Sequence, residues 1–84
     1  MKYMMAKRLE KTTSNQWEVI NFLLKGKGVK MLALSKTVEC ATYFFKQTKK
    51  ILDDNKVDYI AKDENNIMEI QVKDTMVRFG WRIS

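Results

Sequence analysis

The feature that most restricts the fold of this chain is the alternation of apolar and polar residues over residues 59–81. Alternation with a period of two is typical of strands that bury one face and expose the other. Two polar dipeptides, Asn65-Asn66 and Asp74-Thr75, interrupt the alternation and predict tight turns. The last third of the chain is therefore expected to form a three-stranded antiparallel meander.

The two predicted turns also fix which residues lie opposite one another, because the register of a hairpin follows from its turn. One face of the meander then holds apolar cross-strand pairs: Ala61–Ile70, Tyr59–Val72, Val72–Val77, Ile70–Phe79 and Met68–Trp81. The other face holds polar pairs: Lys62–Glu69 and Gln71–Arg78. We expect the apolar face to pack on helices and the polar face to meet solvent.

Two βα units are expected before the meander. Residues 2–6 are predicted to form a short strand. A helix is predicted to begin at Thr13 or Ser14, which are good N-cap residues, and to stop at Gly26 or Gly28. The predicted buried arc of this helix holds Trp17, Val19, Ile20, Leu23 and Leu24.

Residues 29–34 fit either a buried strand or the start of a helix, and we interpret them as a strand. Ser35 is then the expected N-cap of a second helix that runs to about Asp53, and Asn55 is expected to end it with a positive φ. The fold class is therefore α/β: β-α-β-α followed by a three-stranded antiparallel meander, with the helices packed on one sheet. A chain of 84 residues has room for a single domain, residues 1–84.

The charge of the chain is positive and unevenly distributed. Sixteen Lys and Arg residues stand against ten Asp and Glu residues, and residues 1–30 hold seven of the bases but only two of the acids. This excess predicts an anionic partner, nucleic acid above all, while a solvated lysine-rich surface would give the same composition. Both interpretations stay open at this point.

The composition argues against metal chemistry and catalysis. The chain has no histidine, the commonest zinc ligand and general base, and its single cysteine, Cys40, is expected to be a buried structural thiol. We predict no metal site, no cofactor and no enzymatic activity. Since no apolar run is long enough to span a membrane and the first residues do not resemble a signal peptide, we expect no membrane association and a cytoplasmic location, in a host cell if the protein is viral.

One short motif bears on nucleotide binding. A Walker loop has the form GxxxxGK[ST], and Lys11 and Thr12 stand where its lysine and hydroxyl would stand. Glu10 replaces the second glycine of that motif and Met5 the first. A carboxylate at the tightest point of the loop would repel a triphosphate, so nucleotide hydrolysis is not expected. The same residues also fit a basic turn in front of a helix.

Most of the chain resembles, in order, the start of the P-loop ATPase domain of phage large terminases and related helicase-like motor proteins. The resemblance rests on the basic loop ending in KTT, the amphipathic helix, the GKG turn, the strand VKMLALS with the helix after it, and the hairpins. It implies that Lys11 matches the phosphate-binding lysine and Thr12 the metal-binding hydroxyl. The Walker loop is degenerate at Glu10, and the resemblance stops before a Walker B acid would occur.

A second resemblance is to the Alba family of nucleic-acid-binding proteins. The stretch ALSKTVECA, residues 33–41, which follows the KGKG turn, is similar to the glycine turn and helix of that family. Four residues separate Gly28 from Ala33, where the family has fewer, and three final strands replace two.

The two predicted helix starts define a candidate anion site. In a parallel βαβ unit the helices begin beyond the carboxyl ends of the strands, and their N-termini attract anions. Basic and hydroxyl residues are expected to gather there: Lys7, Arg8, Lys11, Thr12, Ser14 and Lys36. A second basic patch is expected at the opposite end of the sheet: Lys25, Lys27, Lys49, Lys50 and Lys56.

The function that these features predict is that of a small, basic, non-catalytic module of viral or phage type. Its expected partner is nucleic acid, such as DNA, or a protein of a nucleic-acid machine. Two alternatives stay open: a protein-interaction module, such as an inhibitor or assembly factor derived from a motor domain, and a partial nucleotide-binding unit completed by another chain.

Overall fold

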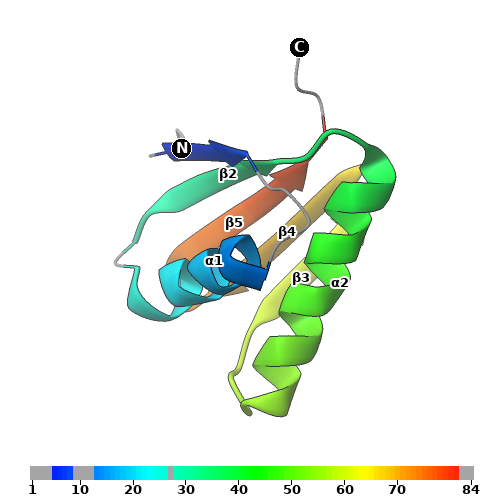
Figure 1. The fold of residues 1–84 in the computed structure, drawn as a ribbon. Helices are drawn as coiled ribbons and strands as arrows, with labels where there is room; N and C mark the ends of the chain where they lie inside the picture. The colour runs from blue at the N-terminus through cyan, green and yellow to red at the C-terminus, as the bar shows by residue number, and fades with distance from the viewer. Residues whose placement is uncertain (1–4, 9–12, 27, 82–84) are drawn as a thin grey trace.

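The computed structural model describes residues 5–8, 13–26 and 28–81, with side chains from residue 16 onward, and shows a mixed sheet with two helices on one face (Figure 1). In chain order the elements are β1 (Met5–Arg8), α1 (Thr13–Lys25), β2 (Lys30–Leu34), α2 (Val38–Asp54), β3 (Ile60–Glu64), β4 (Ile67–Val72) and β5 (Thr75–Gly80). The five strands lie in the order β1-β2-β5-β4-β3. The α/β class and the β-α-β-α-meander order predicted from the sequence are therefore confirmed.

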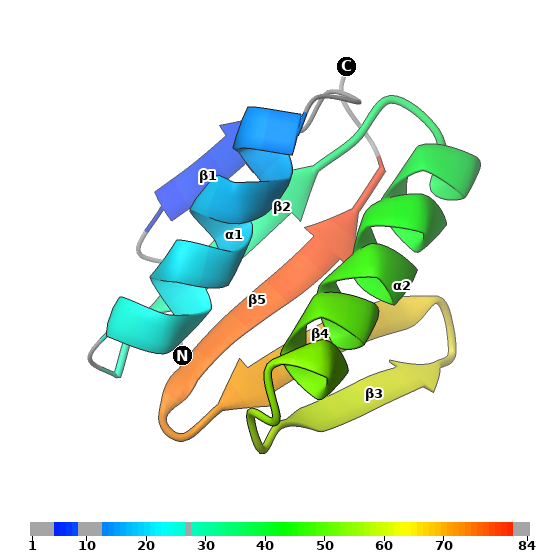
Figure 2. The ribbon, with the colours of Figure 1, turned by 60° about the horizontal axis from the view of Figure 1, so that its bottom comes forward.

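The direction of the strands gives the sheet two different ends. β1, β2 and β5 are parallel to one another, and β4 and β3 complete the sheet through antiparallel pairing. We call the end at which β1, β2 and β5 finish the carboxyl edge, and the end at which they start the amino edge. Both helices run back along the sheet from the carboxyl edge to the amino edge, side by side on the same face (Figure 2).

The core lies between the helices and the sheet. Its buried apolar side chains come from both layers: Val19, Ile20, Leu23, Met31, Ala33, Ala41, Phe44, Phe45, Leu52, Met68, Ile70, Val72, Val77 and Phe79. The rings of Phe45 on α2 and Phe79 on β5 meet edge to face, with 5.8 Å between their centroids. Aromatic pairs in this geometry add to the stabilisation from burial, so this contact helps to fix α2 on the centre of the sheet.

The first helix follows its predicted range, but the prediction of its buried arc was partly wrong. Trp17 and Leu24 are 47% and 49% exposed, and the side chain that joins the buried stripe instead is Gln16. The helix begins at Thr13, so neither Thr13 nor Ser14 lies before it as a cap. The first strand was predicted at residues 2–6 and is observed at Met5–Arg8, and residues 1–4 lie outside the described residues.

The second helix begins and ends slightly differently from the prediction. Its N-cap is Thr37, whose hydroxyl accepts a hydrogen bond of 3.1 Å from the Cys40 amide. Ser35, predicted as the cap, is fully buried at the end of β2, and its amide donates to the Gly80 carbonyl at 2.9 Å. The positive φ beyond the helix belongs to Lys56 and not to Asn55.

The first hairpin has the predicted register. Asn65 and Asn66 both have positive φ, 52° and 63°, as the central residues of a type I′ turn require. Ala61 lies opposite Ile70, and Lys62 opposite Glu69.

The second hairpin was predicted two residues out of register. Its turn is at Lys73-Asp74 and not at Asp74-Thr75, with Lys73 at a φ of 56°. The observed buried-face pairs are Met68–Phe79, Ile70–Val77 and Val72–Thr75. A slip of two residues keeps every side chain on its own face, so the apolar pattern alone does not separate the two registers.

Candidate functional site

The carboxyl edge of the sheet brings several predicted anion-site residues to the same end of the molecule. β1 ends there at Arg8, and α1 begins nearby at Thr13. β2 ends there at Leu34, and the exposed Lys36 lies between it and the start of α2. Ser14 is in the first turn of α1, so the backbone positions of three predicted site residues meet at this edge.

The rest of the predicted anion site is only partly described. Lys7 and Arg8 are placed in β1 by their backbone, and their side chains, like that of Ser14, lie outside the described set. Lys11 and Thr12 fall in residues 9–12, which the structure does not describe. The Walker-like geometry of these positions therefore stays a prediction.

The two helix starts differ in their electrostatic character. A helix N-terminus carries about half a positive charge from its aligned peptide dipoles. The first turn of α1 contains no acidic residue, so nothing within that turn offsets the charge. The first turn of α2 contains Glu39, which is exposed and offsets part of it. Within the first helical turns, the α1 start therefore keeps more of its positive charge than the α2 start.

Two buried polar atoms near this edge have no hydrogen-bond partner among the described residues. They are the side-chain nitrogen Nε2 of Gln16, in the first turn of α1, and the hydroxyl Oγ of Ser35, at the end of β2. Both side chains are at least nine-tenths buried on the helix-covered side of the sheet. An unpaired buried donor costs about 1–3 kcal/mol, so this end of the interior holds polar groups that the described residues do not satisfy.

The positive charge of the chain lies mainly outside the residues whose side chains are described. Within residues 16–26 and 28–81, ten basic side chains stand against nine acidic ones, which is close to balance. The net charge of +6 for the whole chain thus comes mainly from the remaining residues. Arg8 is the last residue of β1, Lys11 follows β1 in the sequence, and Arg82 comes two residues after the end of β5. Arg82 was not included in the predicted site, although its position after a predicted strand was a usable signal.

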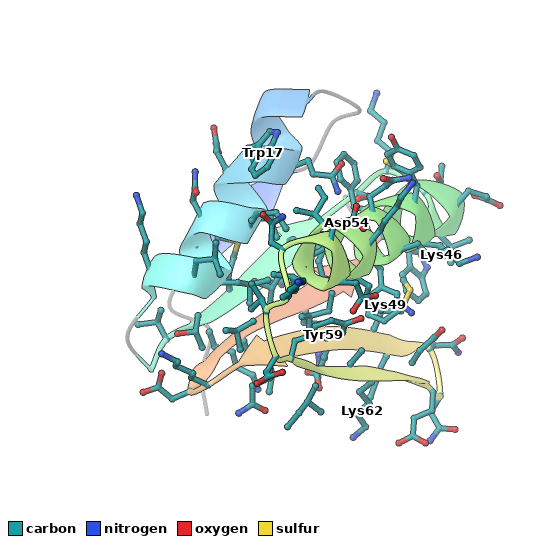
Figure 3. All side chains as sticks on the ribbon, turned by 90° about the horizontal axis from the view of Figure 1, so that it is seen from below. Trp17, Lys46, Lys49, Asp54, Tyr59 and Lys62 are labelled. Atoms are coloured by element: carbon teal, nitrogen blue, oxygen red, sulfur yellow. The ribbon has the colours of Figure 1, made fainter. Side chains whose placement is uncertain are left out.

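The predicted second basic patch is not a uniform surface. Lys25 ends α1, and Lys50 and Lys56 are exposed near the end of α2, but Asp53 and Asp54 lie among the latter. Lys49 is half-buried, with its Nζ atom 4.5 Å from the centroid of the Phe45 ring. Figure 3 shows Lys46 and Lys49 on the side of α2 that is turned away from α1. Lys27 lies outside the described residues.

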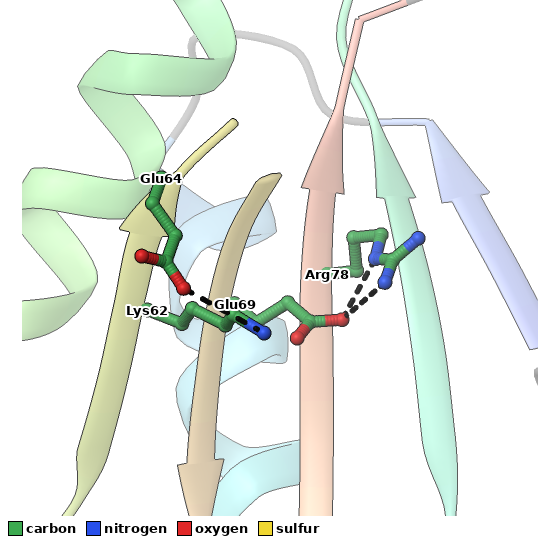
Figure 4. A network of polar contacts seen from close by, with 4 residues as sticks. All are labelled: Lys62, Glu64, Glu69 and Arg78. Carbon is green, nitrogen blue, oxygen red and sulfur yellow. Dashed lines mark hydrogen bonds and ion pairs between the residues drawn. The ribbon is translucent and has the colours of Figure 1, made fainter. Parts of the chain in front are cut away.

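The face of the sheet opposite the helices carries charges of both signs. The carboxylate oxygen Oε2 of Glu69 accepts from both Nε and Nη2 of Arg78 at 2.7 Å, and Lys62 lies 3.9 Å from Glu64 (Figure 4). Glu69 is only 8% exposed, so its carboxylate depends on this partner. Apolar side chains surround these pairs and are partly or fully exposed: Leu32, Leu34, Ile60, Ile67 and Met76. This open face has no strong preference for anions.

Two other reactive side chains, those of Tyr59 and Cys40, pack against the core and suit structural roles. Burial, and then the hydrogen bond and negative charge of Asp53, raise the pKa of Tyr59. Cys40 is partly buried against the core, less deeply than predicted. Among the described residues, no group of three or more His, Cys, Asp and Glu side chains could hold a metal ion, and no helix is long and apolar enough to cross a membrane.

Comparisons of the chain with protein-family models, with curated proteins and with solved structures gave no match.

Proposed function

We propose that this protein is a small basic, non-catalytic module that binds nucleic acid or a nucleoprotein machine, and that it contacts the phosphate groups of the nucleic acid at the carboxyl edge of the sheet. The observation that carries the proposal is the meeting of two helix N-termini and three parallel strand ends at one edge. Helix N-termini and lysine side chains both favour phosphate. The exposed Lys36, which follows β2, adds positive charge to this edge.

The salt dependence of binding tests this proposal. Each duplex phosphate that a lysine neutralises adds roughly 0.9 to the slope of log affinity against log salt. Lys11→Ala combined with Lys36→Ala should weaken binding to all sequences alike and flatten the slope by about one or two units. The matched control, Lys25→Ala combined with Lys27→Ala, removes the same charge at the last residue of α1 and two residues later in the sequence, and should do less. Equal losses from both pairs would contradict a site at the carboxyl edge.

A protein-interaction module is the second candidate function, and the open face of the sheet is the observation that favours it. Ile60 is 68% exposed there, beside charges of both signs. A mixed, partly apolar surface suits a protein partner better than a polyanion. Absence of nucleic-acid binding at low salt, together with loss of a captured protein partner on Ile60→Asp, would favour this function.

The phage-motor resemblance leads to a narrower version of the proposal, in which the module derives from a motor domain, works in the cytoplasm of a host cell and has lost nucleotide hydrolysis. The parallel β1-α1-β2 unit is compatible with that origin but is shared by many α/β proteins. A rise of the melting temperature with ATP would instead support the partial nucleotide-binding unit. Steady ATP turnover that Lys11→Ala abolishes would overturn the non-catalytic assignment.

A further inference from the structure

Two exposed aromatic side chains lie near the carboxyl edge, one on each helix. Trp17 is 47% exposed and Tyr43 is 45% exposed, and each lies in the second turn of its helix. The helices pack side by side and both start at the carboxyl edge, so the two rings lie at the same end of the helical layer. Figure 3 shows the Trp17 ring on the outer surface of α1.

Packing of the core does not account for the position of either ring. The buried stripe of α1 runs through Gln16, Ile20 and Leu23 and leaves Trp17 at its margin. On α2 the neighbouring Phe44 is 1% exposed, and its ring meets the Tyr43 ring edge to face at 5.5 Å. The buried Phe44 ring thus supports the Tyr43 ring by this edge-to-face contact, while nearly half of the Tyr43 surface stays accessible to solvent.

Positive charge accompanies the Tyr43 ring on α2. Lys46 and Lys50 follow Tyr43 by three and seven residues, so they continue its ridge along α2, and both are exposed. Lys36 lies before the helix at the carboxyl edge. The acids nearest in sequence to the rings are Glu18 on α1 and Glu39 on α2.

We propose that the ligand of this surface is single-stranded nucleic acid, with bases stacked on Trp17 and Tyr43 and phosphates at the carboxyl edge and along the lysines of α2. This inference rests on the proposed function and specifies its ligand. Aromatic rings next to a basic track are the usual means of holding single strands, because every base has a π-face. In a duplex those faces are already stacked on neighbouring bases and are closed to protein side chains.

The test compares a fluorescein-labelled 20-nucleotide oligo(dT) with a labelled 20-base-pair duplex, by fluorescence anisotropy at low salt. Trp17→Ala and Tyr43→Ala should each weaken oligo(dT) binding roughly five-fold to a hundred-fold. Neither variant should change duplex binding, and Trp17→Phe and Tyr43→Phe should keep most of the affinity. Leu24→Ala is the matched control, because Leu24 is 49% exposed and lies two turns along α1 from Trp17, but has no π-face.

The outcomes separate the two proposals. Binding of neither oligonucleotide would overturn both the proposed function and the choice of ligand. Salt-dependent binding in which Trp17→Ala, Tyr43→Ala and Leu24→Ala behave alike, or in which the duplex binds at least as tightly as oligo(dT), would overturn only the single-strand inference. In a Trp81→Phe background, quenching of the remaining Trp17 fluorescence by oligo(dT) would support it directly, and unchanged emission at saturation would contradict it.

Discussion

At the scale of single residues, the clearest constraint is the close approach of Gly26 to the sheet. A Cβ atom built on Gly26 would lie 2.5 Å from Cγ2 of Thr75 and 2.7 Å from the Phe22 carbonyl oxygen. Phe22 lies in α1 itself and Thr75 lies in β5, so a side chain at position 26 would distort the end of α1 and push it away from β5. The packing of α1 on β5 therefore favours glycine at position 26.

Gly26→Ala is expected to lower the free energy of unfolding by about 1–3 kcal/mol, the usual cost of overpacking. Denaturant unfolding at neutral pH measures it. Gly80→Ala is the control: its nearest neighbour would be the mobile Cδ2 atom of Leu34 at 3.2 Å, so its cost should be smaller. If both variants lose the same stability, the close packing of α1 on Thr75 is not as described.

Tyr59 should make stability depend on pH in the alkaline range. Burial and Asp53 raise its pKa above the ordinary value of 10.0. The unfolded chain then ionises first as the pH rises, so this contribution to stability is complete below pH 10 and is lost as the pH passes through the raised pKa. Tyr59→Phe should fall less steeply in denaturation midpoint above pH 10 than the wild type. Identical pH profiles would show that Tyr59 is not protected in this way.

At the scale of elements, the start of α2 shows how a sequence signal can be correct in kind and misplaced by two residues. Ser35 and Thr37 both have hydroxyls suited to an N-cap. Ser35 continues the alternation of β2 and is drawn into the interior, which leaves Thr37 to cap the helix. Local propensity did not reveal this, because burial of Ser35 depends on β2 lying inside the sheet.

Substitution of these two residues should therefore affect the free energy of unfolding differently. Thr37→Ala should cost about 1 kcal/mol of unfolding free energy, since it removes the acceptor of the Cys40 amide. Ser35→Ala should be close to neutral or slightly stabilising, because it removes a buried hydroxyl that has no partner in the part of the chain that the structure describes. Thermal and denaturant melts measure both. A larger loss for Ser35→Ala would restore Ser35 as the cap.

The register of the second hairpin can be tested through its charged pair. The observed register places Glu69 opposite Arg78 with a 2.7 Å contact, whereas the sequence alone predicted Gln71 opposite Arg78. A double-mutant cycle on Glu69→Gln and Arg78→Met should give a coupling free energy of about 1 kcal/mol or more. A cycle on Gln71→Ala and Arg78→Met should give a much smaller one. The reverse order would favour the register predicted from the sequence.

At the scale of the whole molecule, the sequence was sufficient for the class, the order of elements and the separation of the two sheet faces. Period-two alternation and helical spacing depend on local geometry, so they survive without knowledge of the tertiary fold. The strand order β1-β2-β5-β4-β3 could not be predicted from these local patterns, because no local sequence signal indicates that β5 pairs with β2. The exposure of Trp17 could not be predicted for the same reason. The apolar arc of α1 is wide, and the sequence does not indicate which side of the arc the sheet covers.

The candidate site, too, could be predicted from the sequence only in part. Connectivity alone indicated that Arg8, Ser14 and Lys36 would meet at one edge, because a helix that follows a strand starts where the strand ends. The unpartnered atoms of Gln16 and Ser35 needed the three-dimensional structure, because burial decides whether a polar group finds water. The interleaved acids near Lys50 and Lys56 were visible in the sequence and weaken the second patch.

The most direct test of the account is to map the ligand contact on the intact chain by backbone amide NMR during titration with an oligonucleotide at low salt. Shifts should concentrate at the carboxyl edge, at residues 13–17 of α1, residues 35–43 around the start of α2 and residues 80–81 at the end of β5, and should extend along α2 to residues 46 and 50. Residues near the amino edge, such as Lys73 and Asp74, and the open-face pair Glu69 and Arg78 should change little. Shifts centred on the open face or on the amino edge would contradict phosphate binding at the carboxyl edge.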